Sequence, residues 1–307
     1  MNRLKGILMI ITGAMMWGAT GPMMEWILAT SDMTISFMLT VRLIVAGFFV
    51  LLFLKMNGRD IYQPLRHKVW LQQMIIFGVF GMLGVQLAFV GSINASNAVI
   101  ATLFQFLAPI YIILFVSVRH KVLPPAAQVV GMIVTMVGLF YLLTNGSLSG
   151  FALSAGAVAW GISVGFAFTF YTLYPTRLMK EWGVLLSVGW GMLIGGGALF
   201  LTSVTKMQAG FVTLGDWKIT LILSLAIIVG TVAFLLFLGS MKYISPVETS
   251  LLSSFEPLTA MIISVIWFGS VLGKWQLVGA IIMLIGVTGL SIAGGKVKEE
   301  KGQLIKR

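Results

Sequence analysis

The chain contains no cysteine among its 307 residues, and only 9% of its residues are charged. The absence of cysteine excludes disulfides, thiolate nucleophiles and thiolate metal sites. The shortage of charge excludes an ordinary water-soluble domain, in which about 25% of residues are charged. The sequence also has no HExxH pair, no Walker loop and no set of paired catalytic carboxylates. We therefore predict no catalytic residues, no metal and no cofactor, and do not expect the chain to be an enzyme.

Hydrophobic residues make up 59% of the chain, and the mean hydropathy is +1.03. A bilayer core about 30 Å thick is crossed by a helix of roughly 20 apolar residues. The first apolar run is longer than that of a signal peptide and lacks a small-residue cleavage site, so we interpret it as a retained helix. The sequence predicts an all-α membrane protein with ten transmembrane helices at 4–27, 34–54, 70–91, 97–117, 125–143, 150–171, 184–203, 217–239, 246–268 and 275–293.

The formal net charge of +11 is distributed unevenly along these helices. With the N-terminus inside, sixteen lysines and arginines fall in inside segments and only Lys206, Lys218 and Lys274 fall outside, while Arg42 lies within a span. This bias matches the positive-inside rule. The charge thus predicts a multi-pass cell-membrane protein with both termini cytoplasmic, in contact with the lipid bilayer and with no nucleic-acid partner.

Sequence markers recur at a fixed distance of 148 residues, and the Trp-Gly pairs at Trp17 and Trp160 are 143 residues apart. Five helices per half is an odd number, so the second half must be inverted relative to the first. We expect two inverted five-helix repeats, residues 1–145 and 146–295, followed by a basic cytoplasmic tail, 296–307. The recurring markers are Gly91-Ser92 with Gly239-Ser240, Pro109 with Pro257, Gln128–Gly131 with Gln276–Gly279, and Gly138 with Gly286.

Several short motifs appear in a characteristic order over both halves. They are Ala-Met-Met-Trp-Gly and Ala-Val-Ala-Trp-Gly in the first and sixth helices, Val41-Arg42-Leu43, Leu107-Ala108-Pro109 and Phe255-Glu256-Pro257-Leu258. In this order the motifs resemble the ten-helix EamA type of the drug/metabolite transporter superfamily. The resemblance implies a secondary transporter working by alternating access. That family handles amino acids, nucleosides, vitamins, polyamine-like cations and drugs, so the resemblance does not select a substrate.

Glu256 is the leading candidate site residue, because an ionisable residue deep in a span is costly and usually functional. It lies about ten residues into the ninth stretch, directly before Pro257, which kinks the helix and frees a carbonyl. Thr249 and Ser253 share its helical face by their spacing. Two interpretations stay open: a proton-coupling or cation-binding carboxylate, or a carboxylate paired permanently with Arg42 as packing.

The region of the first half that is equivalent to Thr249–Glu256 carries no charge. Gln105 stands opposite Ser253, and Ala108 stands opposite Glu256, before a second helix-kinking proline, Pro109. We therefore expect an electrostatically asymmetric cavity between the halves.

Arg42 lies about eight residues into the second stretch, and its guanidinium suits a carboxylate or phosphate on a substrate. It is equally suited to be the counter-ion of Glu256 or of Glu25. By contrast, Ser245-Pro246-Val247-Glu248 has the pattern of a capping box, so we interpret Glu248 as structural.

The two repeated tryptophans, Trp17 and Trp160, lie inside their helices rather than at the membrane interfaces. They are candidates for cavity walls that stack on an aromatic or cationic substrate, or for repeat packing beside the following glycines. Gln86 and Tyr111 are further polar candidates within the spans.

These residues together favour a secondary active transporter of a small organic metabolite or drug, with export favoured over uptake. The direction of transport and proton or exchange coupling stay open. Apolar walls with one acid favour a neutral or cationic, partly aromatic substrate. The alternatives are a membrane-embedded lipid-modifying enzyme, which requires a polar catalytic cluster near one interface, and a non-transporting receptor or scaffold. The sequence leaves the oligomeric state open and allows a homodimer.

Overall fold

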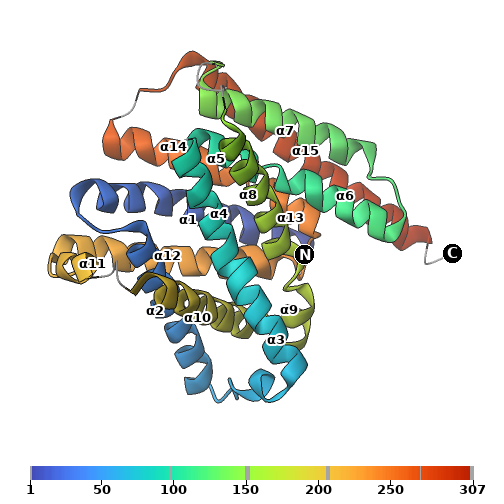
Figure 1. Ribbon diagram of the computed structural model, residues 1–307. Helices are drawn as coiled ribbons and strands as arrows, with labels where there is room; N and C mark the ends of the chain where they lie inside the picture. Colours follow the sequence, from blue (N-terminus) through green and yellow to red (C-terminus); the bar gives the residue numbers. More distant parts are fainter. Residues whose placement is uncertain (1, 97, 149–152, 205–207, 270, 305–307) are drawn as a thin grey trace.

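The computed structural model describes residues 2–96, 98–148, 153–204, 208–269 and 271–304, although the side chains of 98, 99, 208, 209, 268 and 290–304 are outside the description. No strand occurs in these ranges, and the chain forms one bundle of helices (Figure 1). The elements are α1 (Asn2–Thr30), α2 (Ile35–Met56), η1 (Gln63–Arg66), α3 (Lys68–Ile76), η2 (Phe77–Leu83), α4 (Gly84–Ala95), α5 (Ala98–Gln105), α6 (Ala108–His120), α7 (Ala126–Thr144), α8 (Ala155–Leu173), α9 (Thr176–Trp182), α10 (Val184–Ser203), α11 (Gln208–Thr213), α12 (Trp217–Ser240), α13 (Pro246–Leu252), α14 (Phe255–Phe268) and α15 (Lys274–Leu304).

Nine helical segments in the described part are long and apolar enough to cross a membrane. They coincide with the first nine predicted stretches, so the all-α membrane fold is confirmed. The tenth predicted stretch, 275–293, lies within α15, whose apolar portion with described side chains is Lys274–Gly289. The nine segments are Asn2–Thr30, Ile35–Met56, Lys68–Ala95, Ile100–His120, Ala126–Thr144, Ala155–Trp182, Val184–Ser203, Trp217–Ser240 and Pro246–Trp267.

Two of these spans are interrupted just before a proline. One helix stops at Gln105 and resumes at Ala108, before Pro109, while the other stops at Leu252 and resumes at Phe255, before Pro257. A proline has no N–H to donate and disfavours helical geometry in the residue before it. Within a membrane the freed carbonyls need other partners. The hydroxyl groups of the two serines in the second break donate to carbonyls of the last turn of α13, at 2.7 and 2.8 Å.

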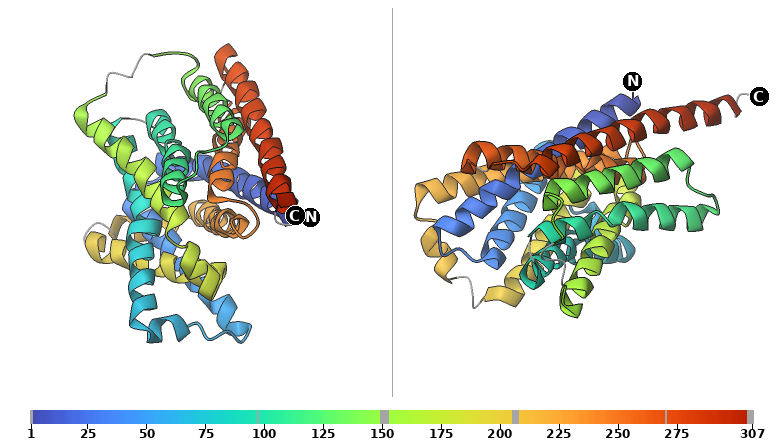
Figure 2. Two further views of the ribbon diagram at one scale, coloured as in Figure 1. Left: turned by 90° about the vertical axis from the view of Figure 1, so that its right-hand side faces the viewer. Right: turned by 90° about the horizontal axis from the view of Figure 1, so that it is seen from above.

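The packing of the helices follows the sequence repeat (Figures 1 and 2). α2 packs against α10 and α7 against α15, and both pairs join helices that are equivalent in the repeat. α1 packs against α12 and α14, while its equivalent α8 packs against α4, α5 and α6. The start of α1 and the end of α15 lie at the same end of the bundle (Figure 2).

Glycines bring α7 and α15 into backbone contact. A Cβ atom on Gly138 would lie 2.8 Å from the carbonyl oxygen of Gly279, and one on Gly286 would lie 3.1 Å from that of Gly131. Gly138 and Gly286 are repeat equivalents, as are Gly131 and Gly279. The contact therefore maps onto itself when the two halves are exchanged, and the paired residue numbers show that the two helices run antiparallel.

Candidate functional site

An aromatic cluster fills the centre of the bundle around Trp17 of α1. The Trp17 ring lies edge-on to Phe234 of α12, with 4.6 Å between ring centroids, and 5.2 Å from Phe237. Two rings of α8, Phe168 and Tyr171, lie 6.2 and 6.3 Å from the Trp17 ring. Helices from both halves of the sequence thus contribute to one aromatic wall.

Arg42 of α2 lies beside this wall and is 7% exposed. Its guanidinium carbon lies 5.5 Å from the ring centroid of Phe234, a cation–π contact, and Nη1 donates to the sulfur of Met24 at 3.4 Å. A thioether is a weak acceptor, so these contacts leave most of the five N–H donors without a strong acceptor. Within the described part of the chain, no carboxylate forms a salt bridge with Arg42.

Glu256 lies in the first turn of α14, at the helix start that the proline break creates. A helix N-terminus favours negative charge, because the amide groups there point away from the helix. The side chain has no hydrogen-bond partner in the described chain, and its Oε2 atom is fully buried. Arg42 and Glu256 lie within electrostatic range of each other without forming an ion pair. Two ionisable residues of opposite type thus lie within the spans of the described chain and form no direct contact with each other.

Gly18 brings α1 close to the start of α14. A Cβ atom on Gly18 would collide with the carbonyl oxygen of Glu256 and would lie 2.9 Å from the Cβ of Thr259. Only glycine permits this approach, so the Trp-Gly pair fixes α1 against the start of α14. The Trp17 ring itself packs against α8 and α12.

Three polar candidates from the two interrupted spans are buried in the helices. The hydroxyl group of Ser253 donates to the carbonyl of Ser250 at 2.7 Å. Thr249 is fully buried and shares a 3.0 Å hydrogen bond with Ser240. Gln105, from the equivalent break of the first half, is 8% exposed. The two hydroxyl groups thus stabilise the interrupted helix, and no hydrogen bond joins them to Glu256.

The remaining candidates lie in other packing environments. Trp160 is 46% exposed, and its ring packs against Gly91 rather than within the cluster around Trp17. Tyr111 stacks on Phe166 with 4.5 Å between ring centroids. Gln86 donates to the carbonyl of Met82 at 2.9 Å, while its Oε1 atom is buried without a partner.

Sequence reasoning missed Tyr171, which is fully buried with an unpartnered hydroxyl group and packs in the central cluster. A tyrosine within an apolar span is a signal in itself, because a buried phenol normally has a hydrogen-bond partner; this one is the last residue of the predicted stretch 150–171. It also missed Met24 and Phe234, the two contacts of Arg42. Nothing in their residue types distinguishes these two from ordinary apolar packing.

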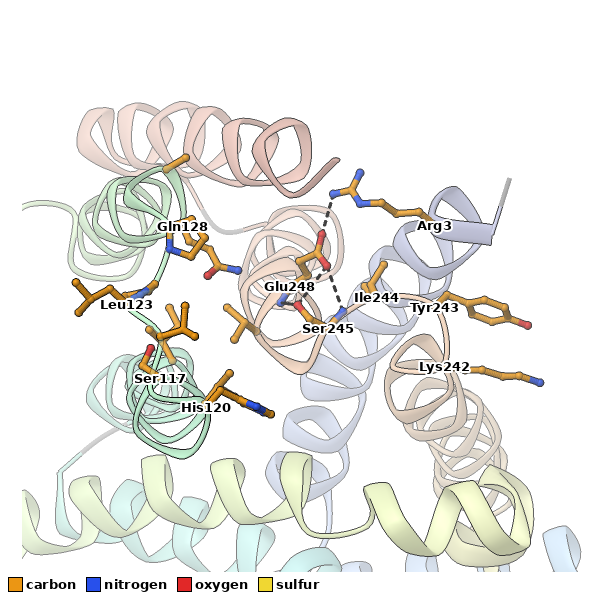
Figure 3. A pocket seen from close by; sticks show the side chains of 17 residues that line it. Arg3, Ser117, His120, Leu123, Gln128, Lys242, Tyr243, Ile244, Ser245 and Glu248 are labelled. Atoms are coloured by element: carbon orange, nitrogen blue, oxygen red, sulfur yellow. Dashed lines mark hydrogen bonds and ion pairs between the residues drawn. The ribbon is translucent and has the colours of Figure 1, made fainter. Parts of the chain in front are cut away.

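A second candidate region is a cavity of about 880 Å³ near the start of α1, between α6 and α7 on one side and α13 on the other. Arg3 reaches across to Glu248 at 2.8 Å, and Ser117, His120 and Gln128 lie on the opposite wall (Figure 3).

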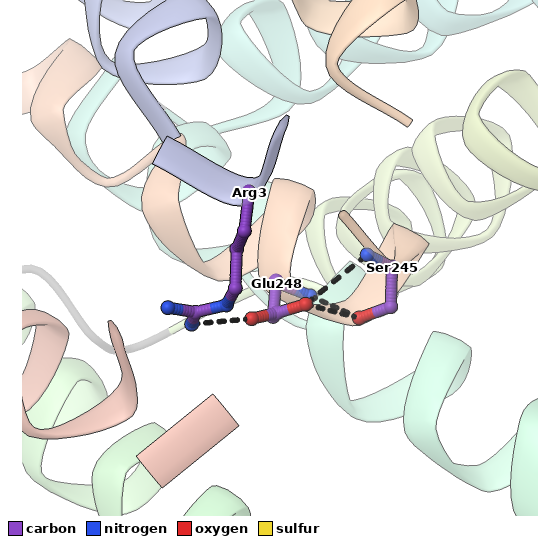
Figure 4. Close-up of polar contacts among 3 residues, drawn as sticks. All are labelled: Arg3, Ser245 and Glu248. Carbon is purple, nitrogen blue, oxygen red and sulfur yellow. Dashed lines mark hydrogen bonds and ion pairs between the residues drawn. The ribbon is translucent and has the colours of Figure 1, made fainter. Parts of the chain in front are cut away.

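The capping box predicted at Ser245 and Glu248 is confirmed. The serine hydroxyl accepts from the Glu248 amide at 3.1 Å, and the Glu248 carboxylate accepts from the Ser245 amide at 3.1 Å (Figure 4). The ion pair with Arg3 is an addition that the sequence pattern did not predict.

Comparison with known proteins identifies the chain's relatives. The model of the EamA-like transporter family matches residues 4–144 and again residues 155–292. The chain is 31% identical over 289 residues to the "uncharacterized inner membrane transporter YicL" of Salmonella typhimurium, covering 94% of this chain and 95% of that protein. It is 23% identical over 226 residues to the "uncharacterized transporter YyaM" of Bacillus subtilis, covering 69% and 70%.

The fold is also shared with a protein of known crystal structure, with a TM-score of 0.74 at 15% identity over 94% of this chain and 98% of that one. The two matches of the family model, together with the nine apolar helices, show a multi-pass membrane protein. The chain belongs to the EamA-like transporter family.

Proposed function

We propose that this cell-membrane protein is a secondary active exporter of a small organic molecule, with Glu256 as its coupling carboxylate. The observation that carries the proposal is the buried, unpartnered Oε2 atom of Glu256 at the centre of the bundle. Glu256 as a whole is half-buried, so its carboxyl group has both a buried oxygen and access from outside the packed interior. A buried carboxyl oxygen without a hydrogen bond or a direct counter-ion is costly, so the group is suited to exchange a proton for a substrate group.

The mechanism we propose is alternating access of two inverted five-helix halves with both termini cytoplasmic. The glycine contact between α7 and α15 supports it, since antiparallel helices that exchange equivalent contacts are expected from an inverted repeat. The equivalent neighbours of α1 and α8 support it further. In this scheme α15 supplies the tenth span.

We propose export as the direction of transport, with the cavity of about 880 Å³ as the cytoplasmic entrance. It opens beside Arg3 and Lys242, at the end of the bundle where the basic residues predict the cytoplasm. A substrate would enter from this side when Glu256 is deprotonated, and a proton would displace it after the site opens to the outside.

The first test does not require a known substrate. Purified protein is reconstituted in liposomes, and a trapped pH dye measures proton flux while a metabolite library is added outside or inside. We expect at least one compound to drive proton movement through wild type and none to do so through Glu256→Gln. Glu25→Gln is the matched control, because Glu25 is an exposed carboxylate near the end of α1. Coupled flux retained in Glu256→Gln, or lost equally in Glu25→Gln, would contradict the coupling role.

A dependence of the coupled flux on pH can be assigned to Glu256, because few other charged groups face this residue. Arg42 of α2 is a cation with an electrostatic effect on Glu256. α14 packs against α1 and α7, of which α7 has no charged residue, and the charges of α1 and of the preceding α13 lie near helix ends. These last are Arg3, Lys5, Glu25 and Glu248.

A further inference from the structure

A groove of about 530 Å³ lies between the start of α1 and the end of α12. It shares no described lining residue with the larger cavity beside the Arg3–Glu248 ion pair. Leu4 and Leu8, two of its lining residues, are 61% and 55% exposed. Side chains exposed to this extent on a transmembrane helix face lipid. The lining includes Leu4, Lys5, Leu8, Met9, Thr12 and Leu236.

The walls of this groove are mainly apolar and follow the helix axis. Leu4, Leu8 and Thr12 are spaced four residues apart and so lie on one face of α1. Met9 covers Gly239 of α12, where a Cβ atom would lie 2.9 Å from the methionine methyl group. From Leu4 to Thr12 the helix rises about 12 Å, which is close to half of a bilayer core about 30 Å thick. The groove therefore has the length and the chemistry for one acyl chain of one leaflet.

The end of the groove nearest the start of the chain is basic. The Lys5 ammonium lies 5.2 Å from the centroid of the Tyr243 ring, a cation–π contact that holds it at this end. Lys242 is exposed, and its side chain and that of Tyr243 point away from Glu248 (Figure 3). Among the described residues no carboxylate forms a salt bridge with Lys5 or Lys242, and Glu248 is bound by Arg3. Two ammonium groups beside the same tyrosine are thus free to bind an anion.

We propose that this groove binds an anionic phospholipid, with one acyl chain along α1 and the headgroup phosphate held by Lys5 and Lys242. Basic residues between membrane helices recognise anionic headgroups, and each lysine near the surface contributes about fivefold to the affinity. A soluble anion would leave the apolar walls uncovered, and a neutral lipid would leave the lysines without a counter-ion. The site goes beyond the proposed function, because it requires only that this end of the bundle lies at a membrane surface. In the proposed orientation that surface is the cytoplasmic one.

The test compares lipids that differ in headgroup charge alone. Full-length protein in neutral detergent micelles is titrated with dioleoyl phosphatidylglycerol or with dioleoyl phosphatidylcholine, and the rise in unfolding temperature gives the apparent affinity. We expect wild type to bind phosphatidylglycerol about tenfold or more tightly than phosphatidylcholine. Glycerol 3-phosphate carries the phosphate without the chains and should not stabilise the protein at the same concentrations.

Two lysine variants test the headgroup contact. Lys5→Gln and Lys242→Gln should each reduce the preference for phosphatidylglycerol about fivefold, and the double variant should bind the two lipids equally. Lys5→Arg keeps the charge and should keep the preference, which guards against variants that fail to fold. Lys55→Gln is the matched control, because Lys55 is an exposed lysine in the last turn of α2 and does not line the groove.

A third variant tests the chain contact. Thr12→Phe fills the inner end of the groove and should weaken the binding of both lipids about twofold or more, because a few lost carbon contacts amount to that factor. The ratio of the two affinities should stay unchanged. Met15→Phe is its control, since Met15 is 46% exposed on the same helix and does not line the groove.

Several results would overturn the lipid site. One is equal binding of the two lipids by wild type, and another is a preference that persists in the double lysine variant. An equal loss of preference in Lys55→Gln would replace the groove by a general effect of surface charge. Stabilisation by glycerol 3-phosphate as strong as that by the lipid would make it a site for soluble phosphates. An unchanged affinity in Thr12→Phe would contradict the placement of the acyl chain.

Discussion

Two arginine–glutamate combinations connect the first two helices to the ninth span, and they behave differently. At one end of the bundle Arg3 and Glu248 form a 2.8 Å salt bridge, and the glutamate also completes a capping box. In the centre Arg42 and Glu256 remain without a direct contact and lack strong hydrogen-bond partners. The first combination is a stabilising contact, whereas the second is the one to which the proposed function assigns the transport site. The same two residue types thus differ in their partners within one span.

The sharpest way to test the contrast is to remove each arginine in turn. Arg42→Gln should reduce substrate-driven flux in liposomes to the background rate, because the site loses its only buried cation in the described chain. Arg3→Gln should retain most of the flux, because Arg3 lies in a stabilising contact at the helix end. Equal losses of flux in Arg42→Gln and Arg3→Gln would contradict the contrast between the two arginine–glutamate combinations.

Gly18→Ala should disturb the central site without changing a charge. The added methyl group collides with the Glu256 carbonyl, and such overpacking lowers the free energy of unfolding by about 1–3 kcal/mol. Unfolding in mixed micelles with increasing dodecyl sulfate would measure the change. Gly21→Ala is the matched control on the same helix, since a Cβ atom there meets nothing within 4 Å. A stable Gly18→Ala protein would contradict the close approach of α1 and α14.

Ser245→Ala addresses the structural combination. It removes the N-cap of α13 and should lower the free energy of unfolding by about 1 kcal/mol. The same unfolding assay applies, with Ser224→Ala as control, because the Ser224 hydroxyl only donates to the carbonyl of Thr220 within its own exposed helix surface. A larger effect of Ser224→Ala than of Ser245→Ala would argue against the capping box as a source of stability.

The smallest expected effect is the coupling between Arg3 and Glu248. A double-mutant cycle with Arg3→Gln and Glu248→Gln should give about 0.2–1 kcal/mol, since both side chains are partly exposed at the bundle end. The coupling should fall as salt concentration rises. A coupling energy of zero at low salt would show that the ion pair between Arg3 and Glu248 does not stabilise this end of the bundle.

The sequence predicted the parts of the fold that depend on local composition. The stretch 184–203 matches α10, and the ends of 34–54 lie within one or two residues of those of α2. The ends of a long apolar run coincide with the ends of the helix that crosses the membrane. The division of the fourth and ninth spans into two helices each was anticipated only as a kink. A proline marks where a helix is disturbed, but the surrounding packing decides whether it bends or stops.

The site was only partly visible in the sequence. Arg42 and Glu256 stood out because charges are rare within spans, and Trp17 stood out because it is repeated. Whether the two charges pair depends on distances between α2 and α14, which no local pattern contains. The same holds for Trp160, whose sequence context repeats that of Trp17 but whose ring lies on the surface. The repeated Trp-Gly motif therefore does not give the two tryptophans a common environment.

The glycine contact between α7 and α15 has a consequence for how such a chain changes over generations. Glycines of both halves face the backbone of the other half here, so neither half can gain a side chain at these positions. A larger residue at Gly138 would strike Met283 and Gly279, and a larger residue at Gly286 would strike Thr135 and Gly131. This helix pair therefore restricts both halves of the sequence at equivalent positions, whereas Ala108 and Glu256 are equivalent positions with different residues.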